Sequence, residues 1–168
     1  DSVRALHVLR GDPLFTAAQV IVGSVKTAEG VVREITPEIK GLMKKFWPGM
    51  VSLNLRPQLG LSWDLGDNNQ LDRISIRIPK AKFAKALVAQ TGPLAVASAS
   101  RKGMPTPQAI SDVMVLDSDV ALKFDNGKLR KGPVSTVIEA DETGVRVLRV
   151  GAVSLDEIQA IVPGATGA

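Results

Sequence analysis

Apolar and polar residues alternate along several short stretches of the chain. Val51, Leu53 and Leu55 alternate with polar residues, and the segment 74–78 repeats the pattern. A period of two places every second side chain on the same face, so each stretch is predicted to be a half-buried strand. Further strands are predicted at 19–23, 94–97, 120–124, 134–139 and 145–149. The sequence Asp125-Asn126-Gly127-Lys128 then predicts a hairpin turn.

Helices are predicted between these strands. Thr36, followed by Pro37 and Glu38, is typical of a helix start, because threonine caps the first turn and proline fits within it. This helix is predicted to reach residue 46. Others are predicted at 3–9, 26–34, 81–90 and 154–162, with loops at 57–69 and 101–107 and a frayed tail at 163–168. Some connections are hairpins and others are helices, so residues 1–168 are expected to form one α/β domain with a mixed sheet.

The amino-acid composition excludes several kinds of functional site. The chain has 168 residues, 45% of them hydrophobic, with no cysteine and one histidine. Disulfides, cysteine zinc sites and thiol nucleophiles are thereby excluded. Its sequence has neither an apolar run long enough to span a membrane nor a visible signal peptide, so a cytoplasmic protein without a membrane partner is expected. The net charge of +4 is mild evidence for an anionic partner.

Generic motifs add little. No segment matches the phosphate-binding Gly-x4-Gly-Lys-Ser/Thr pattern or the dinucleotide Gly-x-Gly-x-x-Gly pattern. Asp64, Asp67 and Asp72 could hold magnesium, but loop carboxylates are usually solvated, and no metal site is predicted. His7 is expected at the edge of the core or in solvent rather than in catalysis. Trp47 is interpreted as a packing anchor.

Two further groups leave alternatives open. Trp63, like Trp47, fits an anchor better than a platform on which bases stack. A basic cluster could contact phosphates, although an exposed hairpin would carry charge in any case. The cluster consists of Lys123, Lys128, Arg130 and Lys131.

Five blocks, in order, resemble the YrdC/YciO family. They are Phe46-Trp47-Pro48-Gly49, Ile76-Arg77-Ile78-Pro79, the Gly-Pro-Leu block at 92–100, Ser135-Thr136-Val137-Ile138 and the Leu-Arg block at 148–153. The resemblance implies a twisted mixed sheet with outer helices and a concave basic site. It also implies a nucleotidyltransferase that makes L-threonylcarbamoyl-AMP from L-threonine, bicarbonate and ATP. That product feeds a tRNA modification, so tRNA or another RNA is a candidate partner.

The resemblance also implies a nucleotide-binding set. Arg10 falls on the lysine of the family's Lys-x-Arg pair, and Ser98 and Ser100 fall on its Ser-x-Asn pair. Ser135 and Arg149 match positions that contact the nucleotide. An arginine between apolar residues at a strand end is hard to explain as core, which favours a functional Arg149. No residue is assigned to catalysis, and magnesium is a candidate companion of ATP.

The sequence departs from the family pattern at three places. Asp12 replaces the arginine of the Lys-x-Arg pair and would repel phosphate unless it is paired or turned away. Ser100 replaces asparagine. The family's first strand and its Pro-Thr-x-Thr-Val-Tyr-Gly threonine block are expected to be absent, because Asp1 falls after them, and a sheet edge would then be unpaired. These departures keep a second hypothesis open, a non-catalytic paralogue that binds nucleotide or RNA.

Overall fold

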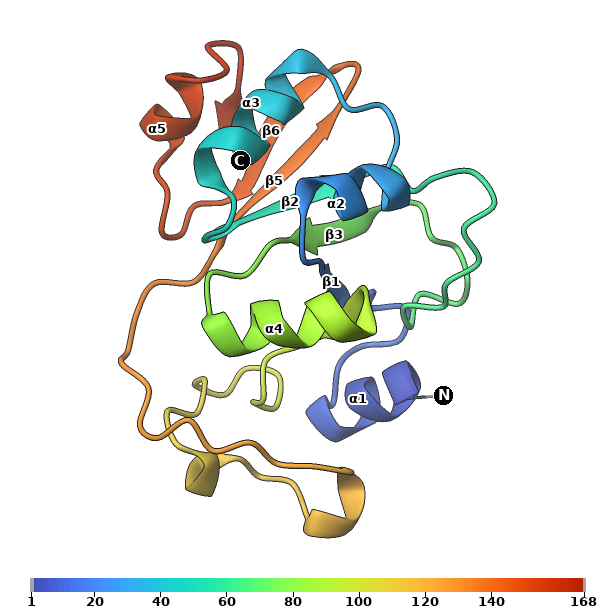
Figure 1. Ribbon diagram of the computed structural model, residues 1–168, viewed down its shortest axis with the longest axis vertical. Helices are drawn as coiled ribbons and strands as arrows, with labels where there is room; N and C mark the ends of the chain where they lie inside the picture. The colour runs from blue at the N-terminus through green and yellow to red at the C-terminus, as the bar shows by residue number, and fades with distance from the viewer. Residues whose placement is uncertain (1, 168) are drawn as a thin grey trace.

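The alternating segments pair into one seven-stranded sheet in the computed structural model, which describes residues 2–167 (Figure 1). The strand order is β4-β1-β3-β2-β5-β6-β7. β1–β3, β2–β5 and β6–β7 are parallel pairs, and the other three pairs are antiparallel. The predicted mixed sheet is thus confirmed. Its strands are β1 (Gln19–Ile21), β2 (Val51–Leu55), β3 (Ile74–Arg77), β4 (Leu94–Val96), β5 (Thr136–Asp141), β6 (Gly144–Arg149) and β7 (Thr166–Gly167).

Within residues 2–167, five α-helices accompany the sheet, and the cap predicted at Thr36 is present. They are α1 (Ser2–Arg10), α2 (Val25–Val31), α3 (Pro37–Phe46), α4 (Lys82–Thr91) and α5 (Leu155–Gln159). Thr36 Oγ1 accepts a hydrogen bond from Ile39 N at 3.4 Å. At α5, Ser154 and Glu157 form a reciprocal capping box. α5 ends earlier than predicted, because the chain from 160 to 162 continues as a tight turn rather than as helix.

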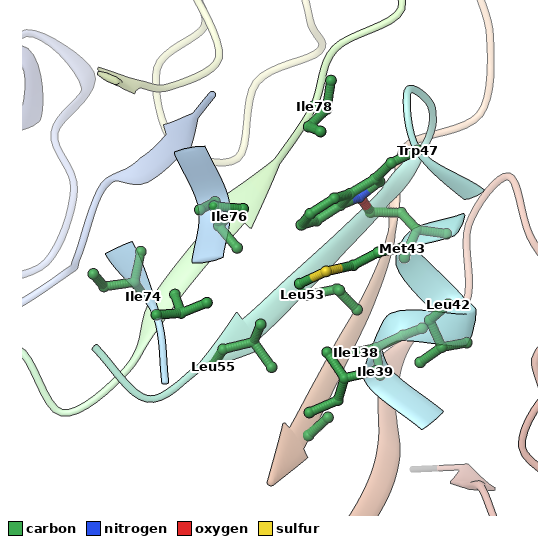
Figure 2. Close-up of a cluster of buried hydrophobic side chains, with 14 of the residues drawn as sticks. Ile39, Leu42, Met43, Trp47, Leu53, Leu55, Ile74, Ile76, Ile78 and Ile138 are labelled. Atoms are coloured by element: carbon green, nitrogen blue, oxygen red, sulfur yellow. The ribbon is translucent and has the colours of Figure 1, made fainter. Parts of the chain in front are cut away.

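One face of the sheet packs on α2, α3 and α5. Ile39 and Leu42 of α3 are fully buried and lie over β2 and β5, where they meet Leu53 and Ile138 (Figure 2). Burying an aliphatic side chain of this size stabilises a fold by about 1.5–3 kcal/mol. Trp47, at the end of α3, is buried and donates from Nε1 to Val51 O at 2.7 Å, so its predicted anchoring role is confirmed.

The other face of the sheet carries polar side chains, as the alternation requires. Ser75 of β3 stands opposite Asn54 of β2, and Ser52 of β2 stands opposite Val137 of β5. Paired residues project to the same side of a sheet, so these positions share one face. Arg77 lies on it too, two residues after Ser75. We call this the polar face.

A β-bulge between β5 and β6 changes which side chains reach that face. Ile138 pairs with Val147, but Val137 pairs with Arg149, which leaves Leu148 as an extra residue in β6. If β6 continued in regular alternation without the bulge, Arg149 would share the core face with Val147, two residues before it. The bulge therefore turns Arg149 to the polar face.

The predicted strand at 120–124 and its hairpin are wrong. The segment from 97 to 135 contains only two short 3-10 turns, η1 (Ile110–Asp112) and η2 (Asp117–Asp119), and extends away from the sheet (Figure 1). The turn chemistry does act locally, since Asp125 Oδ1 accepts a hydrogen bond from Gly127 N at 2.8 Å. The flanking residues have no strand to pair with, and Leu129 N donates instead to Gln108 O.

The frayed tail predicted for 163–168 is also wrong within the described residues; residue 168 lies outside them. Thr166 and Gly167 form β7, which pairs in parallel with Arg146 and Val147 of β6. Ala165 is buried, which fixes this short strand to the core. Among residues 2–167, no helix has the length and apolar character needed to cross a membrane.

Thr136 provides a test of how β5 is joined to the start of α5. Its hydroxyl donates to Val153 O at 2.6 Å and accepts from Gly151 N and Val153 N, and the side chain is fully buried. Thr136→Val keeps the shape and leaves these backbone groups without partners. We expect a loss of about 2–3 kcal/mol in the free energy of unfolding, measured by urea titration. The exposed Thr106→Val is the control; equal stabilities of the two variants would contradict the role of this network.

Candidate functional site

Arg10 brings the first three predicted site residues together. It ends α1, and its Nη1 donates to the carbonyl oxygens of Ser98 and of Ser100, the latter at 2.8 Å. The hydroxyls of the two serines lie 2.8 Å apart. Lys102 N also donates to Arg10 O at 2.8 Å, so the segment after β4 is fixed to the end of α1. The arrangement leaves two adjacent hydroxyls beside a cation.

Asp12 is paired rather than free. Its Oδ2 accepts from Arg10 Nε at 2.8 Å and lies 2.9 Å from His7 Nδ1, and its side chain is only 6% exposed. The hydrogen bond from Arg10 holds the pKa of the Asp12 carboxyl below its ordinary value, against the effect of burial, and the His7 contact adds to this lowering. The negative charge that sequence analysis placed against phosphate is therefore balanced within the protein.

His7 joins this pair to the loop between β2 and β3. Its Nε2 lies 3.0 Å from Leu65 O, so both ring nitrogens face acceptors. Gly66 makes the approach possible, because a Cβ there would collide with the His7 ring. The side chain is 12% exposed, so the predicted position at the edge of the core is confirmed.

The other two predicted residues meet at the start of β5. Arg149 donates to Ser135 O from Nε at 3.2 Å and from Nη2 at 2.9 Å, and Nη2 also reaches Ser135 Oγ at 3.3 Å. Ser52 Oγ donates to Ser135 Oγ at 3.3 Å. Gln19 Nε2 donates to Ser52 Oγ at 2.8 Å. The network connects β1, β2 and β5 across the polar face.

Arg77 was not predicted from the sequence as a site residue. Its guanidinium lies on the polar face, has a buried Nε without a hydrogen-bond partner, and forms no ion pair within residues 2–167. Burial lowers its pKa from the ordinary value. Asn54 Oδ1 on the same face is likewise buried and unpartnered. The sequence did contain one signal. Arg77 is an arginine within a strand, and its neighbours on the same face are serine and asparagine, which cannot neutralise its charge.

Several of the remaining candidates have structural partners. Asp64 accepts from Gly66 N and pairs with Arg4, and Asp67 accepts from Leu71 N. Within the described part of the chain, no group of three or more histidine, cysteine or acidic side chains could hold a metal ion. Trp63 packs partly buried against the core. In the predicted basic cluster, Lys123 pairs with Asp117.

Comparison with known proteins places this arrangement in a family. The Sua5/YciO/YrdC family model, described as Telomere recombination, matches residues 1–151. The chain belongs to the Sua5/YciO/YrdC family. A protein of Mycobacterium tuberculosis is 34% identical over 165 residues, which are 96% of this chain and 74% of that protein.

Two further Sua5/YciO/YrdC relatives are longer. The threonylcarbamoyl-AMP synthase of Bacillus subtilis is 29% identical over 96% of this chain and 47% of its own length. A crystal structure of Pyrococcus abyssi Sua5 complexed with L-threonine superposes with a TM-score of 0.86 at 27% identity, covering 99% of this chain and 49% of Sua5. The chain thus spans about half the length of these two relatives. The resemblance seen in the sequence is confirmed.

The predicted residues form two clusters of the family fold rather than one. Arg10, Ser98 and Ser100 meet at the end of β4, and Ser135 and Arg149 meet at the start of β5. Two open hollows of about 340 and 390 Å³ lie at the β5–β6 turn, and none of the five residues lines them. The polar face between the two clusters is therefore the candidate site, and the nucleotide roles of these residues stay predictions.

The Asp12 contacts predict a pH dependence of stability. Because the pKa of Asp12 is lowered in the folded protein, its ionised form stabilises the fold above the unfolded value of about 3.9, and this contribution is lost as pH falls through the lowered value. We expect wild type to be more stable than Asp12→Asn at neutral pH. The difference should shrink below about pH 4 in urea unfolding curves. A difference that is constant with pH would contradict the pairing.

Proposed function

We propose that this chain makes L-threonylcarbamoyl-AMP and pyrophosphate from L-threonine, bicarbonate and ATP, with release of water. One observation carries the proposal: Arg77 and Arg149 lie on a hydroxyl-rich sheet face, and neither has a carboxylate partner among the described residues. A cation without a counter-charge in such a place is suited to an anionic ligand. ATP, bicarbonate and the threonine carboxylate are all anions.

The chemistry asks mainly for positioning. The threonine amine attacks the carbon of bicarbonate, and loss of water gives a carbamate. A carbamate oxygen then attacks the α-phosphorus of ATP, the bond to the bridging oxygen breaks, and pyrophosphate leaves with that oxygen. Negative charge grows on the leaving group, so fixed cations and hydroxyl donors stabilise the transition state without any covalent role. The described residues offer these groups and need no cysteine nucleophile.

We assign the residues by their surroundings. Ser135 and Arg149 contact the nucleotide at the start of β5, and Ser98 and Ser100 contact it at the end of β4. Arg77, whose charge is unpaired and half-buried between these two clusters, receives a smaller anion, the threonine carboxylate or the carbamate. Arg10 contributes positive charge beside the two serines. Gln19 and Ser52 hold the hydroxyl of Ser135 in place.

The proposal extends to the setting of the reaction. Magnesium would accompany the triphosphate, since its own hard charge suits phosphate oxygens. The product carries an activated carbamoyl group, and the adenosine of a tRNA is the proposed acceptor, in the cytoplasm. The threonylcarbamoyl-AMP synthase name of the Bacillus subtilis relative supports this reading. The non-catalytic alternative is not favoured, because Asp12 is paired with Arg10 and does not face the site as a free charge.

Substitution of the two arginines tests the proposal. We expect Arg149→Ala and Arg77→Ala each to lower the rate of pyrophosphate release by about a hundredfold, because each removes one charged donor from the reacting anions. The measurement is pyrophosphate release from ATP with L-threonine and bicarbonate present. Arg146→Ala is the matched control, since Arg146 lies on the same strand but pairs with Glu139.

The dependence on substrates decides the function. Release that requires both L-threonine and bicarbonate supports the synthase. Release that continues without L-threonine would indicate simple ATP hydrolysis and would overturn the proposal. Normal release by Arg149→Ala would overturn the assignment of the site while leaving the activity intact.

A further inference from the structure

The contacts of His7, Asp12 and Arg10 form a continuous chain between two loops that are far apart in the sequence. Leu65 O contacts His7, His7 contacts Asp12, Asp12 contacts Arg10, and Arg10 contacts the carbonyls of Ser98 and Ser100. Each distance that this chain uses, apart from the short Ser98 contact, lies between 2.8 and 3.0 Å. We call it the His7–Asp12–Arg10 relay.

The donors of Arg10 are largely occupied by this relay. Nε donates to Asp12 Oδ2, and Nη1 donates to two backbone carbonyls. A planar guanidinium held at Nε and Nη1 has a fixed orientation, because its donors form a rigid fork. The carbonyls that it holds belong to the two residues whose hydroxyls meet 2.8 Å apart. The orientation of Arg10 therefore sets the geometry of this serine pair.

We propose that His7 and Asp12 are positioning residues for the nucleotide, acting through Arg10 on Ser98 and Ser100. The inference rests on the proposed function. Asp12 holds the guanidinium at Nε, whereas the serine carbonyls accept from Nη1, and His7 fixes Asp12. Neither residue touches substrate in this account. The family pattern has a second cation at position 12. In this chain Asp12 stands there instead and orients the first cation, Arg10.

Two physical effects of Asp12 oppose each other. A carboxylate near phosphate repels it, so its removal could tighten ATP binding. Its removal also leaves Arg10 Nε without its acceptor and frees the guanidinium to turn. The side chain of Asp12 is 6% exposed and contacts Arg10 and His7. These neighbours compensate most of its negative charge, so it repels phosphate only weakly. We therefore expect loss of orientation to outweigh loss of repulsion.

Gly66 allows the relay to be disturbed without changing any of its members. Its φ is +95°, and a Cβ there would collide with the His7 ring and lie 2.9 Å from Thr16 O. Gly60 in the same loop has φ +81° and nothing within 4 Å of a built Cβ. Gly66→Ala and Gly60→Ala thus carry similar backbone strain, and only the first displaces His7.

The experiment measures the affinities for ATP and for L-threonine separately, by calorimetry on the full chain, with thermal unfolding as a check on folding. We expect Asp12→Ala and Gly66→Ala to weaken ATP binding by about tenfold, the equivalent of one charged hydrogen bond, and to leave L-threonine binding unchanged. Asp12→Asn keeps an acceptor for Arg10 and should recover part of the affinity. Gly60→Ala should bind ATP like wild type.

Each outcome is decisive. Tighter ATP binding by Asp12→Ala means that repulsion prevails and overturns the relay, as do wild-type affinities in both Asp12→Ala and Gly66→Ala. Equal losses for ATP and L-threonine indicate a general structural role and also overturn it. If Gly66→Ala does not fold, the two Asp12 variants give the answer alone. Absence of ATP binding in wild type would instead refute the proposed function, and the relay with it.

Discussion

The pairing register of β2, β3 and β5 is the constraint on which the rest of the molecule depends. It aligns Leu53, Ile76 and Ile138 beneath α3, and the same alignment gathers Ser52, Ser75 and Asn54 on the opposite side. A shift of one residue in any of these strands would exchange the two sets. The apolar core and the polar face are thus two consequences of a single alignment, and the energy of the core maintains the geometry of the site.

Charge on the polar face is distributed unevenly. Where Arg73, Glu139 and Asp141 meet, each cation has an acidic partner and the cluster is structural. Arg77 and Arg149 lack such partners among the described residues. Arg149 is exposed, but Arg77 is half-buried, and an uncompensated guanidinium there costs stability. The missing acidic partners therefore distinguish the candidate site from the ordinary ion pairs of the sheet.

The sequence predicted the long amphipathic elements well and the short ones poorly. The strands at 51–55 and 74–78 show their period within their own residues, whereas β7 has only Thr166 and Gly167 and shows none. Its existence depends on the free edge of β6. The turn at 125–127 had the right local chemistry, but a hairpin also requires a neighbouring sheet.

The site was predictable to the extent that resemblance placed its residues. Arg10 and the serines at 98 and 100 meet as that placement implies, across about 90 residues of chain. The contact of Asp12 with His7 was not predictable, because His7 is held there by Leu65, 58 residues away. Arg77 was missed because its role depends on the lack of an acidic partner among the described residues, which no sequence motif shows.

The extra residue in β6 has a consequence for how this family can vary. Leu148 offsets Arg149 by one position, so the local pairing of β6 with β5 matters more for the arginine than the identity of the extra residue. Replacement of Leu148 by another exposed residue preserves the offset. Deletion of Leu148 would leave the arginine opposite Val137 on the polar face, whereas loss of the bulge with Leu148 retained would turn Arg149 to the core face and bury its charge. A β6 strand of this length therefore needs the bulge, whatever residue occupies position 148.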